Sequence, residues 1–417
     1  MRMRWVAFSS TVVGVFGLVV ACTAGDGRPD PSNGTVIPDG SSGGSSSGDG
    51  ASDAKTDGQD DSACRNTKFD GNETDTDCGG GTCPKCALGK KCLIDGDCAD
   101  GASCTNKVCA KCKDGIANGD ETDVDCGGKA CGPCGVGKRC STGPDCKSEA
   151  CSANACACPT NMTIVALATG GAYCVDTAEV TKGQYNKFIT ANVPVNTQSA
   201  ACAPPTNTTF VPRGAWPPST SPSLSFNLGL PVHYVDWCDA AAYCKWAKKQ
   251  LCGTHTGASV PPADVNAADK DSWFNACTAQ GSKTFPYGNL FQNEACNGTG
   301  SLANNNSFGD EINGDKGVYQ VAVSDGSGNI TSYTNTLCQG GSVGLYQMSG
   351  NLGEWEDSCD GTGAGASCAV RGGSYAAANA PADLACNSTR KVERVPAPPL
   401  GAGTDALADI GIRCCLY

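Results

Sequence analysis

Cysteine is the residue type in this sequence with the most scope for chemistry: 31 cysteines occur among 417 residues, beside only two histidines. Thiolates bind zinc and other soft metals, whereas in an oxidising compartment cysteines pair as disulfides. Two Cys-x-x-Cys pairs have the spacing of zinc knuckles, Cys83–Cys86 and Cys131–Cys134. So many thiols would be reactive in a reducing cytosol, so we expect an oxidising compartment and mainly disulfides. A three-histidine metal site cannot be built from His233 and His255 alone.

Both Cys-x-x-Cys pairs belong to an internal repeat, with one copy at 64–111 and the other at 112–158. Each copy holds eight cysteines that repeat, with Cys158 following the eighth of the second copy, and too little Leu, Ile and Phe to form its own core. We therefore expect a cysteine-rich region at 63–158 held by disulfides. Eight cysteines allow 105 pairings, so the connectivity stays open, and zinc is the alternative. The acidic turns could bind calcium or simply be solvated; their aspartates are Asp75, Asp77, Asp123 and Asp125.

The N-terminus predicts export and anchoring. Arg2 and Arg4 precede an apolar run, and Val19-Val20-Ala21-Cys22 resembles a bacterial lipobox. We expect a signal peptide at 1–21 and lipid on Cys22, with a plain secretory signal as the alternative. Thr23 after the cysteine favours the outer membrane of the bacterial cell envelope. Residues 22–62 are rich in Gly, Ser and Asp and predict a flexible linker.

Charge limits the partners. The formal net charge is −12, which argues against nucleic acid and anionic membrane surfaces. No later segment has the roughly 18 apolar residues of a membrane span, so we expect membrane attachment through the lipid alone.

Residues 159–417 must supply the elements that position any larger site. Thr181 with Gln184 forms a capping box at the start of an expected helix, and Asp236 and Asp271 are expected to cap two more. Short strands are expected between Gly- and Asn-rich loops, one of them at Ala369–Tyr375. The pattern predicts an irregular α+β domain.

Six motifs in this region occur in the order of a known family: AEVTKGQYNKF, PVHYVDWCDAAAYCKWA, FPYGN, GLYQMSGNLGEW, RGGSY and IGIRC. Together they resemble the formylglycine-generating enzyme (sulfatase-modifying factor) family. The resemblance implies a C-type-lectin-like α+β fold with little regular secondary structure. It also implies oxidation of a sulfatase cysteine with copper and oxygen, although other relatives act on other substrates or only bind ligands.

The resemblance places the copper-binding cysteines two and seven residues beyond the aromatic of RGGSY, at Ala377 and Ala382. Both thiols are therefore missing, so we expect neither copper nor a catalytic residue at these positions. The family pattern pairs Cys277 with Cys386, and Cys244 with Cys414 or Cys415. Cys359 and Cys368 flank a short Gly-rich loop and are expected to close it.

The family also implies a structural calcium site in the segment GNLGEW. Carried over, its ligands are Ser349, Gly350, Leu352 and Glu354, a set of backbone oxygens and one carboxylate that suits a hard cation. Alternatively, Glu354 pairs with a nearby cationic side chain or caps a turn. Gly353 stands where the family usually has Trp.

Two functions follow from these observations. In the first, an anchored envelope protein has lost catalysis and binds a protein, peptide or glycan ligand in the inherited groove. In the alternative, an oxidoreductase of the formylglycine-generating or non-haem oxidase type acts on a protein cysteine or a small substrate through a rearranged site. A purely structural envelope role is a third possibility.

Overall fold

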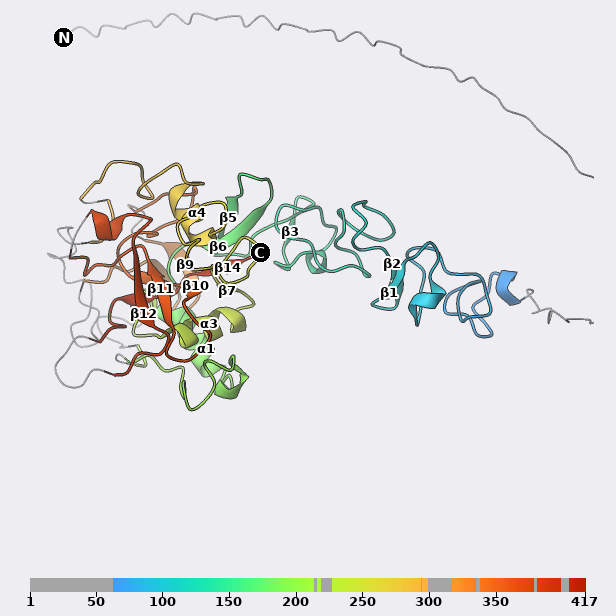
Figure 1. The fold of residues 1–417 in the computed structure, drawn as a ribbon, viewed down its shortest axis with the longest axis horizontal. Coiled ribbons are helices and arrows are strands. Elements are labelled where there is room, and N and C mark those ends of the chain that lie inside the picture. Colours follow the sequence, from blue (N-terminus) through green and yellow to red (C-terminus); the bar gives the residue numbers. More distant parts are fainter. Residues whose placement is uncertain are drawn as a thin grey trace, which may run out of the picture. The chain divides into compact units, whose positions relative to one another are not determined.

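The computed structural model (Figure 1) describes residues 63–213, 216–218, 227–293, 295–298, 317–334, 338–378, 381–398 and 405–417. The expected signal peptide, Cys22 and the linker lie outside these described residues. Within them, no helix combines the length and the hydropathy needed to cross a membrane.

The two cysteine-rich copies consist of turns, short 3₁₀ segments and one small hairpin each. The first copy has 3₁₀ turns at Ala63–Arg65 and Asp95–Asp97 and the strands β1 (Ser103–Thr105) and β2 (Val108–Ala110). The second has a 3₁₀ turn at Gly143–Asp145 and the strands β3 (Cys151–Ser152) and β4 (Ala155–Cys156). The two copies have little regular structure because they contain few large apolar side chains.

Disulfides stabilise the two copies in place of a large apolar core. Numbering the cysteines of each copy from one to eight, both copies join 1 to 3, 2 to 4, 5 to 7 and 6 to 8. The first copy has Cys64–Cys83, Cys78–Cys86, Cys92–Cys104 and Cys98–Cys109. The second has Cys112–Cys131, Cys126–Cys134, Cys140–Cys151 and Cys146–Cys156.

One buried aspartate organises each copy. Asp97 is buried and accepts hydrogen bonds from the backbone N–H groups of Gly80, Leu93 and Ile94. These donors, Leu93 foremost, hold the pKa of Asp97 below its ordinary value. Asp145 occupies the corresponding position in the second copy, where it accepts hydrogen bonds from the backbone N–H groups of Gly128, Ser141 and Thr142.

The C-terminal region has two small sheets and a separate hairpin. The first sheet is antiparallel, in the order β5 (Met162–Ala166), β6 (Ala172–Asp176), β14 (Cys414–Leu416) and β7 (Gln250–Leu251). The second has the order β12 (Thr389–Glu393), β11 (Ser367–Arg371), β10 (Gly353–Cys359) and β13 (Ile410–Gly411), with β13 parallel to β10. The hairpin consists of β8 (Ala322–Ser324) and β9 (Ile330–Tyr333).

Three short helices begin where the sequence predicts them: α1 (Lys182–Thr190), α3 (Trp237–Trp246) and α4 (Ser272–Thr278). Their N-caps are Thr181, Asp236 and Asp271, and each side chain accepts a backbone N–H from the first turn. The expected strand at Ala369–Tyr375 is too long at its C-terminal end. It ends at Arg371, because Gly372 and Gly373 both adopt a positive φ and turn the chain away.

Two apolar clusters form the interior of this α+β domain. One gathers α1, α3 and β10 around Tyr185, Phe188 and Trp355, and the other gathers β6 and α4 around Trp273. Seven disulfides lie in this region, including Cys244–Cys414 and Cys252–Cys415, which tie adjacent residues of β14 to α3 and to the end of β7. The C-terminal strand is thereby fixed into the sheet.

Candidate functional site

The segment after β11 is placed by two glycines. A Cβ on Gly372 would approach the carbonyl oxygen of Met348 to 2.7 Å, and one on Gly373 would approach the carbonyl oxygen of Asp383 to 2.1 Å. A side chain at Gly373 would therefore clash with the backbone. The glycines let the chain pass close to neighbouring loops and bring Ser374 and Ala377 to the surface of a cleft.

This cleft has a volume of about 300 Å³ and lies beside β11, β12 and the start of β13. Its lining residues are Val370, Gly373, Ser374, Ala376, Ala377, Ala378, Asp383, Ser388, Thr389, Arg390 and Asp409. Ala377, one of the two positions where the family resemblance expects a thiol, lies in this lining. The other, Ala382, begins the 3₁₀ turn Ala382–Leu384, next to the lining residue Asp383.

The polar groups of the cleft are held in place by Asp409. One of its carboxylate oxygens lies 2.5 Å from Nη2 of Arg390, and the other accepts a hydrogen bond of 2.5 Å from the Ser374 hydroxyl. Asp409 is largely buried, whereas the Arg390 side chain remains 45% exposed. The pairing therefore orients an accessible guanidinium and a buried hydroxyl in the lining of the cleft. Sequence reasoning missed this pair, because the two residues lie far apart in the chain.

Every described cysteine is bonded to another cysteine. Cys277 pairs with Cys386 and Cys359 with Cys368, and of the two partners that the resemblance allows for Cys244, the structure selects Cys414. The cysteine nearest in sequence to the cleft segment, Cys386, is thus half of a disulfide. A disulfide sulfur is not a thiolate, so the described residues offer no pair of thiolates for Cu(I).

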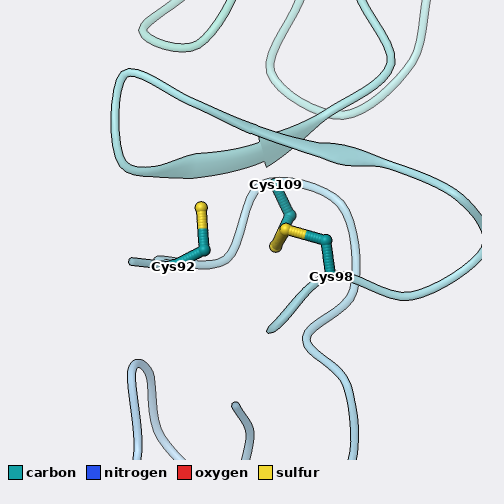
Figure 2. Close-up of side chains that lie close together, drawn as sticks. All are labelled: Cys92, Cys98 and Cys109. Atoms are coloured by element: carbon teal, nitrogen blue, oxygen red, sulfur yellow. A yellow bond between two sulfur atoms is a disulfide. The ribbon is translucent and has the colours of Figure 1, made fainter. Parts of the chain in front are cut away.

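The zinc alternative for the cysteine-rich copies does not fit the structure. In the described residues, four groups of cysteines and carboxylates lie close enough together to hold a metal ion, and each contains both halves of a disulfide. Figure 2 shows one group, in which Cys98 and Cys109 are bonded and the sulfur of Cys92 lies nearby. Cys92 is itself bonded to Cys104. Oxidised sulfurs cannot serve as zinc thiolates.

The aspartates of the acidic turns are engaged by the backbone. Asp75 accepts from the N–H of Lys91 at 2.7 Å, and Asp77 accepts from the N–H of Thr67. Asp123 and Asp125 make the corresponding contacts in the second copy, for example with the N–H of Arg139. These hydrogen bonds join the loops of each copy, so we assign the four carboxylates a structural role.

The expected calcium segment lies in the interior, and only some of its oxygen atoms have hydrogen-bond partners among the described residues. Glu354 is buried; its carboxylate accepts from the Trp273 indole at 2.7 Å and from Nε of Arg413 at 2.8 Å from each oxygen. The hydroxyl of Ser349 donates to the carbonyl of Leu384. By contrast, no described residue donates a hydrogen bond to the carbonyl oxygens of Gly350 or Leu352. Those carbonyls suit a hard cation, whereas the carboxylate already has a cationic partner.

A second buried acidic group was not expected from the sequence. Glu356 follows Trp355 on β10, is completely buried, and has no hydrogen-bond partner for either carboxylate oxygen among the described residues. Its nearest charged neighbours are Arg371, with Nη1 at 3.6 Å, and Asp271, which also approaches Arg371 at 3.8 Å. Burial first, and then the Asp271 carboxylate, raise the pKa of Glu356 well above its ordinary value.

The two histidines lie in separate environments. His233 is buried, with Nδ1 2.7 Å from the carbonyl oxygen of Ala408, and His255 stacks on Tyr173 at a ring-centroid distance of 5.8 Å. Neither belongs to a metal-ligating group within the part of the chain that the structure describes.

The comparisons with known proteins agree with the motifs. The family model described as the sulfatase-modifying factor enzyme 1-like domain matches residues 164–416, so this chain belongs to that family. No curated protein matches the chain.

Three solved structures are similar to this chain at low identity. The crystal structure of CarF is 18% identical, with 59% of this chain and 86% of that chain covered and a TM-score of 0.32. PvdO from Pseudomonas aeruginosa is 13% identical, with 62% and 92% covered and a TM-score of 0.35. Treponema denticola variable protein 1 is 18% identical, with 60% and 86% covered and a TM-score of 0.27.

Proposed function

We propose that this chain is a lipid-anchored protein of the bacterial cell envelope whose sulfatase-modifying-factor domain binds a peptide or glycan without oxidising a cysteine. One observation carries the proposal: the cleft beside Ala377 keeps oriented polar groups while no described cysteine is free to bind copper. Water or backbone oxygen are hard ligands and match Cu(I) poorly, so they would not replace two thiolates.

The cleft has the groups that a neutral polar ligand needs. The Arg390 guanidinium carries five N–H donors, and its bond to Asp409 leaves others for a ligand oxygen. The small side chains of Ala376, Ala377 and Ala378 leave room beside it. A peptide carbonyl or a sugar hydroxyl supplies the matching acceptor.

The catalytic half of the proposal is tested with the full chain, a sulfatase-type cysteine peptide, copper and oxygen. We expect no aldehyde above a control without protein. Aldehyde formation that is abolished by replacing one cysteine of this chain would overturn the proposal and support the oxidoreductase alternative.

The binding half is tested by probing the chain against arrays of extended peptides and of glycans. We expect retention of members of one class, and at least a tenfold loss of affinity in Arg390→Ala. Lys391→Ala is the matched control, because Lys391 is the next residue on β12, is exposed and does not line the cleft. Failure to retain any probe, or equal effects of the two substitutions, would contradict a binding role for the cleft.

We also propose that calcium binds at the segment 349–354 as a structural ion, held mainly by the carbonyls of Gly350 and Leu352. Because Glu354 is shared with Arg413, we expect weak binding, on the order of 10⁻⁴–10⁻³ M, as in extracellular modules. Calcium in that range should raise Tm, and magnesium, which demands a near-ideal octahedral shell, should not. A Tm that is indifferent to millimolar calcium would contradict this assignment.

A further inference from the structure

A second cavity, of about 660 Å³, lies where the first cysteine-rich copy joins the second. One wall is the β1–β2 hairpin, and another is the connection that follows it. The residues that matter for its chemistry are Ser103, Thr105, Lys111, Lys113, Asp114 and Gly132.

The walls of this groove are fixed by contacts between the copies. Asn106, in the turn between β1 and β2, donates a hydrogen bond of 3.2 Å from Nδ2 to the carbonyl of Ala130. Ala110 of β2 packs with Ala130 and Cys131 in a small apolar cluster. The hairpin of one copy and a loop of the next therefore form one surface.

Hydroxyl groups line the hairpin wall. Ser103 and Thr105 are two residues apart on β1, so their side chains share a face of the strand, while Cys104 between them turns inward to Cys92. Both hydroxyls can donate and accept hydrogen bonds.

The connection contributes two lysines that have no acidic partner among the described residues. Lys90 and Lys138 pair with aspartates at 3.4 and 3.7 Å, but no described carboxylate lies at salt-bridge distance from Lys111 or Lys113. The neighbouring Asp114 is turned to its own loop, where it accepts from the N–H of Ile116 and the amide of Asn118. In a chain of net charge −12, this groove has a local excess of positive charge, with two lysines and one aspartate in its lining.

We propose that this groove binds an anionic saccharide, with Lys111 and Lys113 pairing with a phosphate or carboxylate group and Ser103 and Thr105 bonding to sugar hydroxyls. The groove is larger than a bare anion needs, and its hydroxyl wall matches a polyhydroxylated ligand. The site is independent of the cleft beside Ala377.

The test is calorimetric titration of the full chain with glucose 6-phosphate, glucuronate, inorganic phosphate and glucose. We expect at least one charged sugar to bind at least fivefold more tightly than either inorganic phosphate or glucose, and its affinity to fall as salt rises from 50 to 300 mM because the lysines are screened. Comparison of the two charged sugars distinguishes phosphate from carboxylate. Equal affinity for inorganic phosphate would overturn the saccharide assignment, and no preference over glucose would overturn the role of charge.

Two pairs of substitutions locate the site. Lys111→Gln with Lys113→Gln should weaken binding of the charged sugar at least tenfold. The matched control, Lys85→Gln with Lys129→Gln, removes the same charge from exposed positions on the same two copies and should leave the affinity within twofold. The mass of each unreduced variant verifies that its disulfides have formed. Equal losses in the two variants would overturn the proposal, because the effect would then be one of overall charge.

Discussion

The Arg413 guanidinium faces the Glu354 carboxylate in the interior of the domain, with Nε 2.8 Å from both carboxylate oxygens and Nη2 2.7 Å from one of them. Neither side chain reaches solvent. Arg413 also donates to the backbone carbonyls of Asp176 and Gln347. Its side chain therefore connects the start of β14 to β6 and to the loop that precedes β10. The pair is thus a joint between the two sheets.

The first prediction concerns this joint. Glu354→Gln should lower the free energy of unfolding by about 3–5 kcal/mol, because it leaves the Arg413 charge buried without compensation. Urea denaturation measures the change. Glu149→Gln is the control: Glu149 pairs with Lys248 at 2.7 Å on the surface, and its loss should cost about 1 kcal/mol or less. Equal effects of the two substitutions would contradict a structural role for the buried pair.

The second prediction concerns pH. Since the pKa of Glu356 is raised in the folded state, the folded chain keeps a proton that the unfolded chain releases above about pH 4.5. The stability that this group contributes is therefore complete below about pH 4.5 and is lost as pH rises through the folded pKa. Glu356→Gln should remove this dependence and be more stable than the original chain at pH 8. Unfolding in urea at pH 5, 7 and 9 tests it.

A surface substitution on another strand of the same sheet isolates the effect of Glu356. Glu393→Gln, at an exposed position of β12, should leave the pH profile of stability unchanged. If the profiles of Glu356→Gln and the original chain run parallel, Glu356 does not hold the extra proton.

The third prediction is that the two cysteine-rich copies respond alike to loss of a bridge. Removing Cys98–Cys109 from the first copy, or Cys146–Cys156 from the second, should destabilise that copy by about 2–5 kcal/mol, since neither has an extensive core. Mass spectrometry of unreduced peptides should find the same four linkages in each copy. Stoichiometric zinc with free thiols in the purified chain would contradict both expectations.

The fourth prediction concerns anchoring. Cys22→Ser should release the chain into the soluble fraction of the envelope, because the thiol proposed to carry the lipid is gone. Fractionation of cells that express each form measures the shift. Cys22→Ser that stays with the membrane would show that another part of the chain holds it there.

The fifth prediction concerns the cleft. Ala377→Cys together with Ala382→Cys should bind one Cu(I), because two thiolates at these positions restore the soft ligands that the family resemblance places there. Competition with a colorimetric Cu(I) chelator measures the affinity. Each single substitution is the control and should bind at least a hundredfold more weakly. Equal binding by the single and double variants would show that the two positions do not converge.

Local chemistry explains what could be predicted from the sequence. The N-caps Thr181, Asp236 and Asp271 each act on backbone groups three residues away, so a short segment contains all the information. Likewise, six ordered motifs were enough to identify the family and its α+β fold. The end of β11 was misplaced because glycine is compatible with both a strand and a turn, and only the approach of Asp383 decides between them.

The remaining features depend on contacts between distant segments. Asp409 meets Arg390 although β13 and β12 lie at opposite edges of the sheet, and nothing in either segment indicates this contact. Glu356 is charged and yet buried, because β10 is covered on both faces. The disulfide connectivity of the copies was equally hidden, because eight cysteines in a loop-rich segment have no periodicity that favours one pairing.

In both copies the eight repeated cysteines pair within their own copy, and no bridge joins one copy to the other. Cys158, which follows the eighth cysteine of the second copy, pairs with Cys174 of the C-terminal region. Duplication or deletion in the gene of the segment from the first to the eighth cysteine of a copy therefore leaves no half-cystine without its partner. The number of copies in this region can change without leaving cysteines unpaired. Recombination alone can therefore lengthen or shorten the part of the chain that precedes the C-terminal domain.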